Sequence, residues 1–386
     1  MDFVAFLHDL DHRKQWKIHQ LHGGLVNFTV RATESYTMFS DDQDTAPRLD
    51  LSGYHSLILK HAPPYIASVG SEAPFSQMRQ VVEARALAYL GAINFPEQLC
   101  IPRLVHHDPD QFVLVMEDLG DLINLEQQLS RQDEAANQEG EQLDLANQLG
   151  ISLAQLHSVP VGRALGESLY NPDARKVVFE LAVKSIASRL ETHGISDYGL
   201  LAERCAQHFV FTQSVCSDPD NTSALLPVFS MGDLWPPSIL VDNARNRLGL
   251  VDWEFAGPSL PLADLAQLAA HLQVYSLKRS SSHAPKFLRQ LIKSYAEKSV
   301  ELGAPWAEPS RLQVALRAAV ILHGREIVNV SIERVRRGCD YLRWAGDTPK
   351  DLDVEALLEL QEACTHAIIT IFRGFTPTVS GEDAYA

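Results

Sequence analysis

The sequence predicts an α+β protein in which a small β-rich N-terminal lobe precedes a larger, mostly helical C-terminal lobe. Over roughly the first hundred residues, short β-type runs alternate with turns. Beyond Gly120 the character changes, and helix-type periodicity dominates from Asn171 onward. Two β-type runs, 238–242 and 248–252, interrupt the helical part, and acidic residues accompany both. A run of strands followed by a run of helices is typical of the α+β class.

The elements of the small lobe follow one another in a simple order. "LVNFTVRA", "YHSLILKHA" and "QFVLVMEDL" are β-type runs, and "FSQMRQVVEARALAYLG" has the spacing of a helix. Strand, strand, helix and strand describe a compact α+β unit. The composition changes near residues 117–121, so we predict one lobe at 1–119 and a second at 120–386.

The start of the second lobe contains two contrasting stretches. Residues 130–145, "SRQDEAANQEGEQLDL", are polar and acidic, which predicts a mobile excursion without a core of its own. The segment that follows predicts an amphipathic helix, because leucines recur at spacings of four, four and three: Leu145, Leu149, Leu153 and Leu156.

Composition limits the class of protein. The chain has 386 residues, of which 46% are hydrophobic and 21% charged, as in ordinary globular proteins. Its formal net charge of −16 disfavours nucleic acid or an anionic membrane as a partner. Five scattered cysteines without a CxxC pair are typical of free thiols in a reducing compartment. No apolar run reaches the roughly 18–20 residues of a membrane span, so we expect a cytoplasmic protein.

The two acidic stretches predict a carboxylate cluster. "SILVD" and "LGLVD", joined by "NARNR", read as an antiparallel hairpin. Asp233 precedes the first strand and Asp252 ends the second, so a hairpin brings both to one edge, with Glu254 two residues beyond. Clustered carboxylates repel and persist where a metal or a raised pKa relieves them, and this set suits Mg²⁺ bound through substrate phosphates. Three unrelated, solvated loop acids are the alternative.

The small lobe contributes two further charged candidates. Lys60 ends the apolar run "SLILK", and a lysine at the end of a buried strand requires a partner or a phosphate. Glu83 lies on the otherwise apolar face of the following helix, which makes Lys60 its economical partner. A surface lysine and a surface glutamate are the alternative. Gly23 and Gly24 permit a tight turn and close approach of backbone N–H groups to phosphate, a weak signal by itself.

In this order, the glycine turn, the strand lysine, the helix glutamate, "MEDL", "GDLWPPSIL" and "VDWEFAGPSLPLADLA" resemble the aminoglycoside phosphotransferase / choline kinase family. The resemblance extends from about residue 15 to about residue 275 and implies a protein-kinase-like, two-lobed fold. Within the family, the motifs are closest to those of methylthioribose kinases and the fungal 4-hydroxytryptamine kinase. It also implies that 1–119 is a nucleotide-binding lobe and that 120–386 holds the catalytic loop, the metal-binding loop and the acceptor site.

The resemblance implies roles for individual residues. Asp233 would be the catalytic base, Asp252 the principal Mg²⁺ ligand, and Asp264 a buried brace of the catalytic loop. The ATP-binding residues would be Gly23, Gly24, Asn27, Lys60, Glu83, Glu117, Asp118 and Leu119. Two departures from the family stand out: Met231 replaces the usual histidine, and Ser238 replaces the usual asparagine metal ligand. We expect Glu254 to compensate as a second ligand, with Ser238 peripheral.

The functional prediction is an ATP- and Mg²⁺-dependent kinase that phosphorylates a hydroxyl of a small molecule, with an amine- or ring-bearing acceptor favoured. Trp235 is a candidate wall of the acceptor pocket, although packing explains it equally well. Arg325 is a weaker acceptor candidate on what reads as a solvated helix face. The alternatives are a catalytically inactive kinase-like nucleotide-binding module and, less well supported, a protein kinase.

Overall fold

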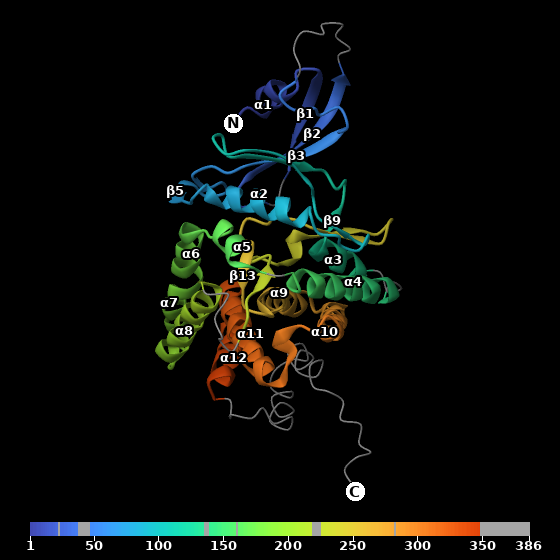
Figure 1. The fold of residues 1–386 in the computed structure, drawn as a ribbon. Helices are drawn as coiled ribbons and strands as arrows, with labels where there is room; N and C mark the ends of the chain where they lie inside the picture. The colour runs from blue at the N-terminus through green and yellow to red at the C-terminus, as the bar shows by residue number, and fades with distance from the viewer. Residues whose placement is uncertain are drawn as a thin grey trace.

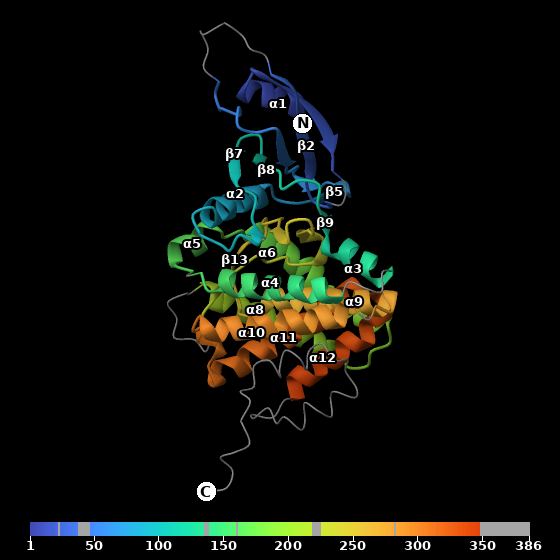
Figure 2. The ribbon, with the colours of Figure 1, turned by 90° about the vertical axis from the view of Figure 1, so that its right-hand side faces the viewer.

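The computed structural model describes residues 1–21, 24–37, 47–134, 139–159, 161–217, 225–281 and 283–347. Strands gather in the N-terminal part and helices in the C-terminal part, one above the other in Figure 1 and again in the turned view of Figure 2. This confirms the predicted α+β fold with a β-rich lobe followed by a helical one. No helix in the described ranges has the length and apolar character needed to cross a membrane.

The N-terminal part is built on a five-stranded antiparallel sheet. Its strands, in spatial order, are β1 (Lys14–Gln20), β2 (Phe28–Thr37), β3 (Ser56–His61), β8 (Val113–Glu117) and β7 (Leu104–Asp108). Helix α1 (Phe3–Leu10) contacts β1 and buries Phe6, Leu7 and Leu10 with the inward residues of the sheet. The predicted runs correspond to β2, β3 and β8. The sequence analysis missed β1 and β7 because polar residues dominate both.

Helix α2 (Met78–Leu90) lies beneath this sheet and above the helical part in Figure 1. A short hairpin, β4 (Tyr65–Ile66) and β5 (Gly70–Pro74), precedes it. The helix buries Val82, Leu87 and Leu90, as its spacing predicts, but also the charged Arg79 and Glu83. Because a buried charge is costly unless it is paired, these two residues indicate that a polar network meets this helix.

The C-terminal part combines two small sheets with a bundle of helices. One sheet has the order β6 (Leu99–Cys100), β12 (Arg247–Leu250), β11 (Ile239–Asp242), β9 (Ile123–Asn124), and the other pairs β10 (Val228–Ser230) with β13 (Gly257–Ser259). The principal helices are α3 (Leu125–Glu134), α4 (Glu139–His157), α6 (Pro172–Val178), α8 (Tyr198–Ser217), α9 (Ala263–Arg279), α10 (His283–Glu301), α11 (Pro309–Val330) and α12 (Val335–Asp347). Shorter turns of helix are α5 (Arg163–Ser168), η1 (Phe179–Lys184), α7 (Ile186–Thr192), η2 (Pro236–Ser238), η3 (Pro305–Ala307) and η4 (Ile332–Arg334).

The polar stretch at 130–145 differs from its prediction. Residues up to Glu134 belong to α3 and those from Glu139 to α4, whereas 135–138 lie outside the described residues. Buried Leu125 and Leu129, one turn apart, hold α3 to the core, and Leu145 does the same for α4. A few well-placed leucines therefore outweighed the polar composition of this stretch.

Candidate active site

The predicted hairpin is present and brings its two flanking acids to one end. β11 and β12 pair in antiparallel register, from Ile239 opposite Leu250 to Asp242 opposite Arg247. The backbone N–H of Val251 donates to the carbonyl of Ser238, which continues the pairing to the end where Asp233 enters and Asp252 leaves. The side chains of both acids are partly accessible, and the charge of Asp252 acts on Asp233.

Asp233 lies on a loop that requires glycine. Gly232 has a φ of +79°, and a Cβ on it would lie 2.2 Å from the carbonyl oxygen of Phe255, so no other residue fits there. The Nε2 of Gln267, on α9, donates to Oδ1 of Asp233 at 2.5 Å. Burial and, second, the negative charge of Asp252 raise the pKa of Asp233 to about 7. A carboxyl with this pKa is suited to accept a proton near neutral pH.

Asp264 is hydrogen-bonded to the loop of residues 230–233, which carries Asp233. Its carboxylate accepts hydrogen bonds from Oγ of Ser230 (2.6 Å) and from the backbone N–H groups of Met231 (2.8 Å) and Gly232 (3.1 Å). His157 Nε2 lies 3.1 Å from the same carboxylate, and its Nδ1 lies 2.9 Å from the hydroxyl of Tyr295. Burial alone would raise the pKa of Asp264, but the contacts of His157 and Ser230 hold it below its usual value. These residues, with Asp264 at the centre, are called the Asp264 network below.

Lys60 forms the centre of a second group. Its Nζ lies 2.7 Å from Oε2 of Glu83 and 2.6 Å from Oδ1 of Asp252. Burial alone would lower the pKa of Lys60, but the charges of Asp252 and Glu83 raise it overall. Asp252 has a φ of +77°, a conformation that L side chains seldom adopt, and the adjacent Trp253 N–H donates to Glu83. The structure therefore brings together the lysine, the helix glutamate and the acid that follows the hairpin.

Glu254 enters a buried polar network that the sequence analysis did not foresee. Its Oε2 accepts a hydrogen bond from Nδ2 of Asn27 at 2.8 Å and lies 3.5 Å from Nε of Arg79. The Oδ1 of the same Asn27 accepts from Arg79 Nε at 3.0 Å. Burial and the charge of Asp252 raise the pKa of Glu254. The one signal of Arg79 in the sequence is an arginine among the buried positions of α2, in register with Glu83.

The connector after β8 and the glycine turn have ordinary local partners. Glu117 accepts from Nε of Arg103 at 3.1 Å, and Asp118 pairs with Arg31 at 2.8 Å. The Cδ1 of Leu119 lies against Gly249 of the hairpin strand β12. Gly24 opens the turn into β2, and Gly23 lies outside the described residues. The connector therefore contacts both the N-terminal sheet, through Arg103 and Arg31, and strand β12, through Leu119.

Three further predicted residues lie apart from the acids' carboxylates. Ser238 Oγ donates to the carbonyl of Trp235 at 2.8 Å and accepts from its N–H at 3.3 Å, which closes the turn η2. The Trp235 ring is tilted against His271 of α9, with 5.9 Å between the ring centroids. Arg325 is buried on α11, pairs with Glu326 at 2.7 Å, and its charge acts on Cys205 and His208 of α8.

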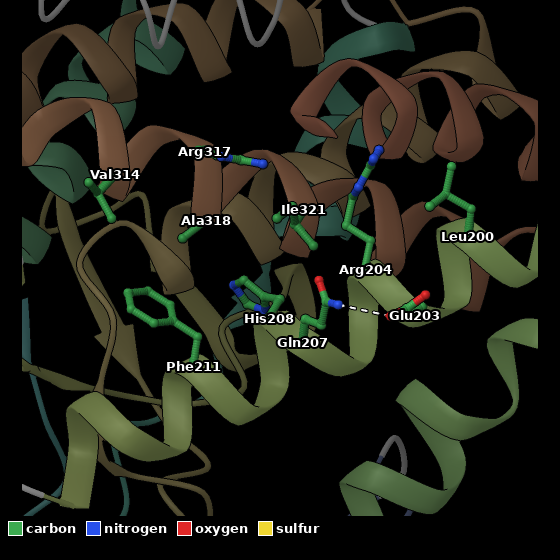
Figure 3. Close-up of a pocket in the computed structure, with 10 residues that line it drawn as sticks. All are labelled: Leu200, Glu203, Arg204, Gln207, His208, Phe211, Val314, Arg317, Ala318 and Ile321. Atoms are coloured by element: carbon green, nitrogen blue, oxygen red, sulfur yellow. Dashed lines mark hydrogen bonds between the residues drawn. The ribbon is translucent and has the colours of Figure 1, made fainter. Parts of the chain in front are cut away.

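A cavity of about 170 Å³ adjoins the loop that carries Asp233. It is bordered by Val82 of α2, by Gly232, Glu254 and Phe255, and by residues of α6 and α8 such as Arg175 and Gln213. A larger one, about 370 Å³, lies between α8 and α11 (Figure 3). Its walls include Glu203, Gln207 and Phe211 from α8 and Val314 from α11, and none of the predicted site residues lines it.

The donor set fits Mg²⁺ that arrives with a nucleotide. Among the described residues, no group of three histidine, cysteine or acidic side chains is arranged to hold a metal alone. Asp252 has a side chain 35% exposed, whereas Glu254 is 3% exposed. Lys60 pairs with Asp252, yet burial and the charge of Asp252 still raise the pKa of Asp233 and of Glu254, so a further cation would relieve the remaining repulsion. One or two carboxylates completed by phosphate oxygens and water are the usual surroundings of Mg²⁺.

The sequence is similar to those of known phosphotransferases. The model of the phosphotransferase enzyme family matches residues 44–302. The chain is 23% identical over 307 residues to 4-hydroxytryptamine kinase of Psilocybe cyanescens, which covers 72% of this chain and 73% of that protein.

Among solved structures, the wild-type aminoglycoside 2'-phosphotransferase-IIIa with GDP aligns with a TM-score of 0.44, 18% identity, and 89% and 96% of the two chains covered. An ethanolamine kinase of Plasmodium vivax aligns with a TM-score of 0.46, 11% identity, and coverage of 86% and 81%. The model of the phosphotransferase enzyme family spans well over half of the sequence, and the chain therefore belongs to that family.

Proposed function

We propose that this phosphotransferase transfers the γ-phosphoryl group of ATP to a hydroxyl group of a small molecule, with Mg²⁺ as cofactor. The observation that carries the proposal is the meeting of Lys60, Glu83 and Asp252 beside a carboxyl, Asp233, whose pKa is raised to about 7. Phosphoryl transfer requires positioning and charge stabilisation, and this group of residues can supply both.

The acceptor hydroxyl would bond to the γ-phosphorus as the bond from that phosphorus to the β–γ bridging oxygen breaks and ADP leaves. Asp233 would take the hydroxyl proton on its carboxylate, and Gln267 would hold that carboxylate in place. Lys60 would leave Asp252 and contact the α/β-phosphates, while Glu83 keeps its ammonium oriented. Mg²⁺ bound at Asp252 would neutralise charge on the transferring phosphates.

The boundary of the two lobes and the remaining roles belong to the same proposal. Residues 1–119 would bind the nucleotide between the glycine turn and the connector at Glu117–Leu119, and 120–386 would carry the catalytic loop and the acceptor site. The four described free cysteines support a reducing, cytoplasmic location: Cys100, Cys205, Cys216 and Cys339. No nucleic-acid or membrane partner is expected, because the net charge is −16.

An amine- or ring-bearing alcohol is the favoured acceptor. Trp235 follows Asp233 by two residues, and its ring contacts His271, which lies one helical turn after Gln267. These rings would offer aromatic faces to an acceptor, and the acidic side chains nearby would attract a protonated amine. The similarity to a kinase named for 4-hydroxytryptamine, a ring-bearing amine, points in the same direction.

The inactive alternative rests on Met231 and Ser238. The backbone N–H of Met231 still donates to Asp264, and Ser238 still closes its turn, so neither departure disorders the loop. This favours an active enzyme over a module that merely binds nucleotide.

The test is a pair of measurements on the purified chain. Thermal shift with Mg-ATP reports nucleotide binding, and ADP release against a panel of sugars, amines and indoles reports transfer and the acceptor class. We expect both signals in the wild type and neither at full strength in Lys60→Met. Binding without ADP release from any acceptor would favour the inactive module, and release with neutral sugars alone would move the acceptor toward methylthioribose-like compounds.

A further inference from the structure

Arg79 is a charged side chain in the interior of the small lobe that the proposed reaction does not use. It is fully buried, and its guanidinium also lies 4.8 Å from the centre of the Phe75 ring. Its two terminal nitrogens donate to five backbone carbonyls, those of Val26, Pro63, Tyr65, Phe75 and Ser76. These carbonyls come from the turn before β2, the segment after β3 and the entry to α2. One side chain therefore joins three segments of the lobe.

The remaining nitrogen of Arg79, Nε, faces Asn27 and Glu254. Its Nε donates to Oδ1 of Asn27 and lies 3.5 Å from Glu254, while Nδ2 of Asn27 donates to Glu254 at 2.8 Å. Both ends of the Asn27 amide are thus hydrogen-bonded, and the residue is buried, with 8% of its surface exposed. An arginine, an amide and a carboxylate thus contact one another directly. We call these three residues the Arg79 network.

The Arg79 network and the Lys60–Asp252 ion pair both connect the small lobe to the segment Asp252–Glu254. We expect the two connections to respond differently when a nucleotide binds. Lys60 lies 2.6 Å from Asp252, and both groups are the ones proposed to leave each other for phosphate and Mg²⁺. The contacts of Glu254 with Asn27 and Arg79 use none of those groups. When the Lys60–Asp252 pair separates, the Arg79 network is the connection that can keep the turn of residues 24–27 above the segment Asp252–Glu254.

We propose that Arg79 and Asn27 are positioning residues. Through Glu254 they hold the turn of residues 24–27 against the segment Asp252–Glu254 before any ligand binds. The biological purpose of this contact rests on the proposed function, whereas the contact itself can be tested without any kinase activity. It assigns Glu254 to the contact between lobes, in place of the direct metal ligation expected from the sequence.

The direct test is hydrogen–deuterium exchange in EDTA without nucleotide, on wild type, Glu254→Gln, Asn27→Leu and Asp242→Asn. We expect faster exchange at the amides of residues 24–30 in the first two variants, because each weakens the network. Asp242→Asn is the matched control: it changes a buried carboxylate that pairs with Arg247 into an amide, at the end of β11 next to the hairpin turn. Its exchange at 24–30 should equal that of the wild type.

Unchanged exchange in Glu254→Gln would overturn the proposal, because a residue that serves only a metal leaves the metal-free protein unaltered. Glu254→Gln is isosteric, so it decides the matter even where Asn27→Leu fails to fold. This measurement needs no catalysis, so a chain without kinase activity would refute the proposed function and leave the network testable.

Kinetics separate positioning from ligation in the active enzyme. Both variants should raise the KM for ATP about tenfold, the scale of one charge-assisted hydrogen bond, and the double variant should be no worse than either single one. The Mg²⁺ concentration for half-maximal activity at saturating ATP should stay unchanged. A several-fold rise in that concentration for Glu254→Gln, with Asn27→Leu silent, would identify Glu254 as a metal ligand and overturn the proposal.

Discussion

The Asp264 network and the carboxylate cluster meet at the loop of residues 230–233, yet the pKa values of their carboxyl groups are shifted in opposite directions. Asp264 receives donors from a hydroxyl, two backbone N–H groups and His157, and these contacts lower its pKa. Asp233, by contrast, has its pKa raised to about 7 by burial and by Asp252. One network is satisfied by the protein alone, whereas the other retains charge that a ligand would balance.

This contrast separates parts that hold the loop from parts that react. A carboxylate with several donors is stable in one state and has little reason to exchange a proton. Crowded carboxylates weaken the fold, and such local costs are concentrated at functional sites. Substitutions in the Asp264 network should therefore reduce stability, and those in the cluster should reduce activity.

The largest expected effect comes from Asp233→Asn. Turnover should fall at least about 10²-fold, because a general base contributes on this scale and an amide cannot accept the proton. The affinity for Mg-ATP, measured by calorimetry, should stay close to the wild-type value. Asp242→Asn is the control and should retain its turnover. An Asp233→Asn enzyme with full activity would remove the base from the mechanism.

Asp264→Asn should have the opposite character. The amide presents N–H groups to donors that now meet a carboxylate, so we expect the free energy of unfolding to fall by about 1–3 kcal/mol, the usual cost of a buried polar group left unsatisfied. Urea unfolding measures this loss of stability, and Asp242→Asn is again the control. The loss should be smaller in the control, because Arg247, the partner of Asp242, is partly exposed to solvent. Equal stability of Asp264→Asn and wild type would show that the network does not hold the loop.

The pH dependence of stability gives a smaller effect with a definite sign. The pKa of Asp233 is higher in the folded protein than its ordinary value of 3.8, so folding favours its protonated form. Without Mg²⁺, the contribution of this residue to stability should be complete below about pH 4 and should be lost as pH rises through about 7. In EDTA at pH 8, the melting temperature of Asp233→Asn should therefore be higher than that of the wild type. At pH 4 the variant should have no such advantage. A difference that is constant with pH would contradict the raised pKa.

Ser238→Ala should change least. Its hydroxyl bonds to the backbone of Trp235, so its loss costs about 1 kcal/mol of stability at most and frees no metal ligand. The Mg²⁺ concentration for half-maximal activity should equal that of the wild type. A crippled Ser238→Ala would mean that the metal follows the asparagine position of the family, and the assignment of Asp252 as principal ligand would need revision.

Much of this arrangement was predictable because it depends on local pattern. The apolar run ending at Lys60, the helix carrying Glu83 and the two β-type runs around the acids all report their own period, and the hairpin alone places Asp233 and Asp252 at one end. Polar edge strands such as β1 and the leucine-anchored α3 were missed or misjudged, because composition there conflicts with packing.

What only the tertiary structure decided is which side chains meet across the fold. Asn27 and Glu254 are 227 positions apart, and Gln267 reaches Asp233 from a helix whose pattern reads as ordinary. Arg79 on a helix looks like a solvated residue until the turn of residues 24–27 and the segment Asp252–Glu254 pack against it. A periodic pattern shows which face of an element is buried. The partner of a buried charge is set by the packing of distant elements, where leaving that charge unpaired would cost more than any local preference.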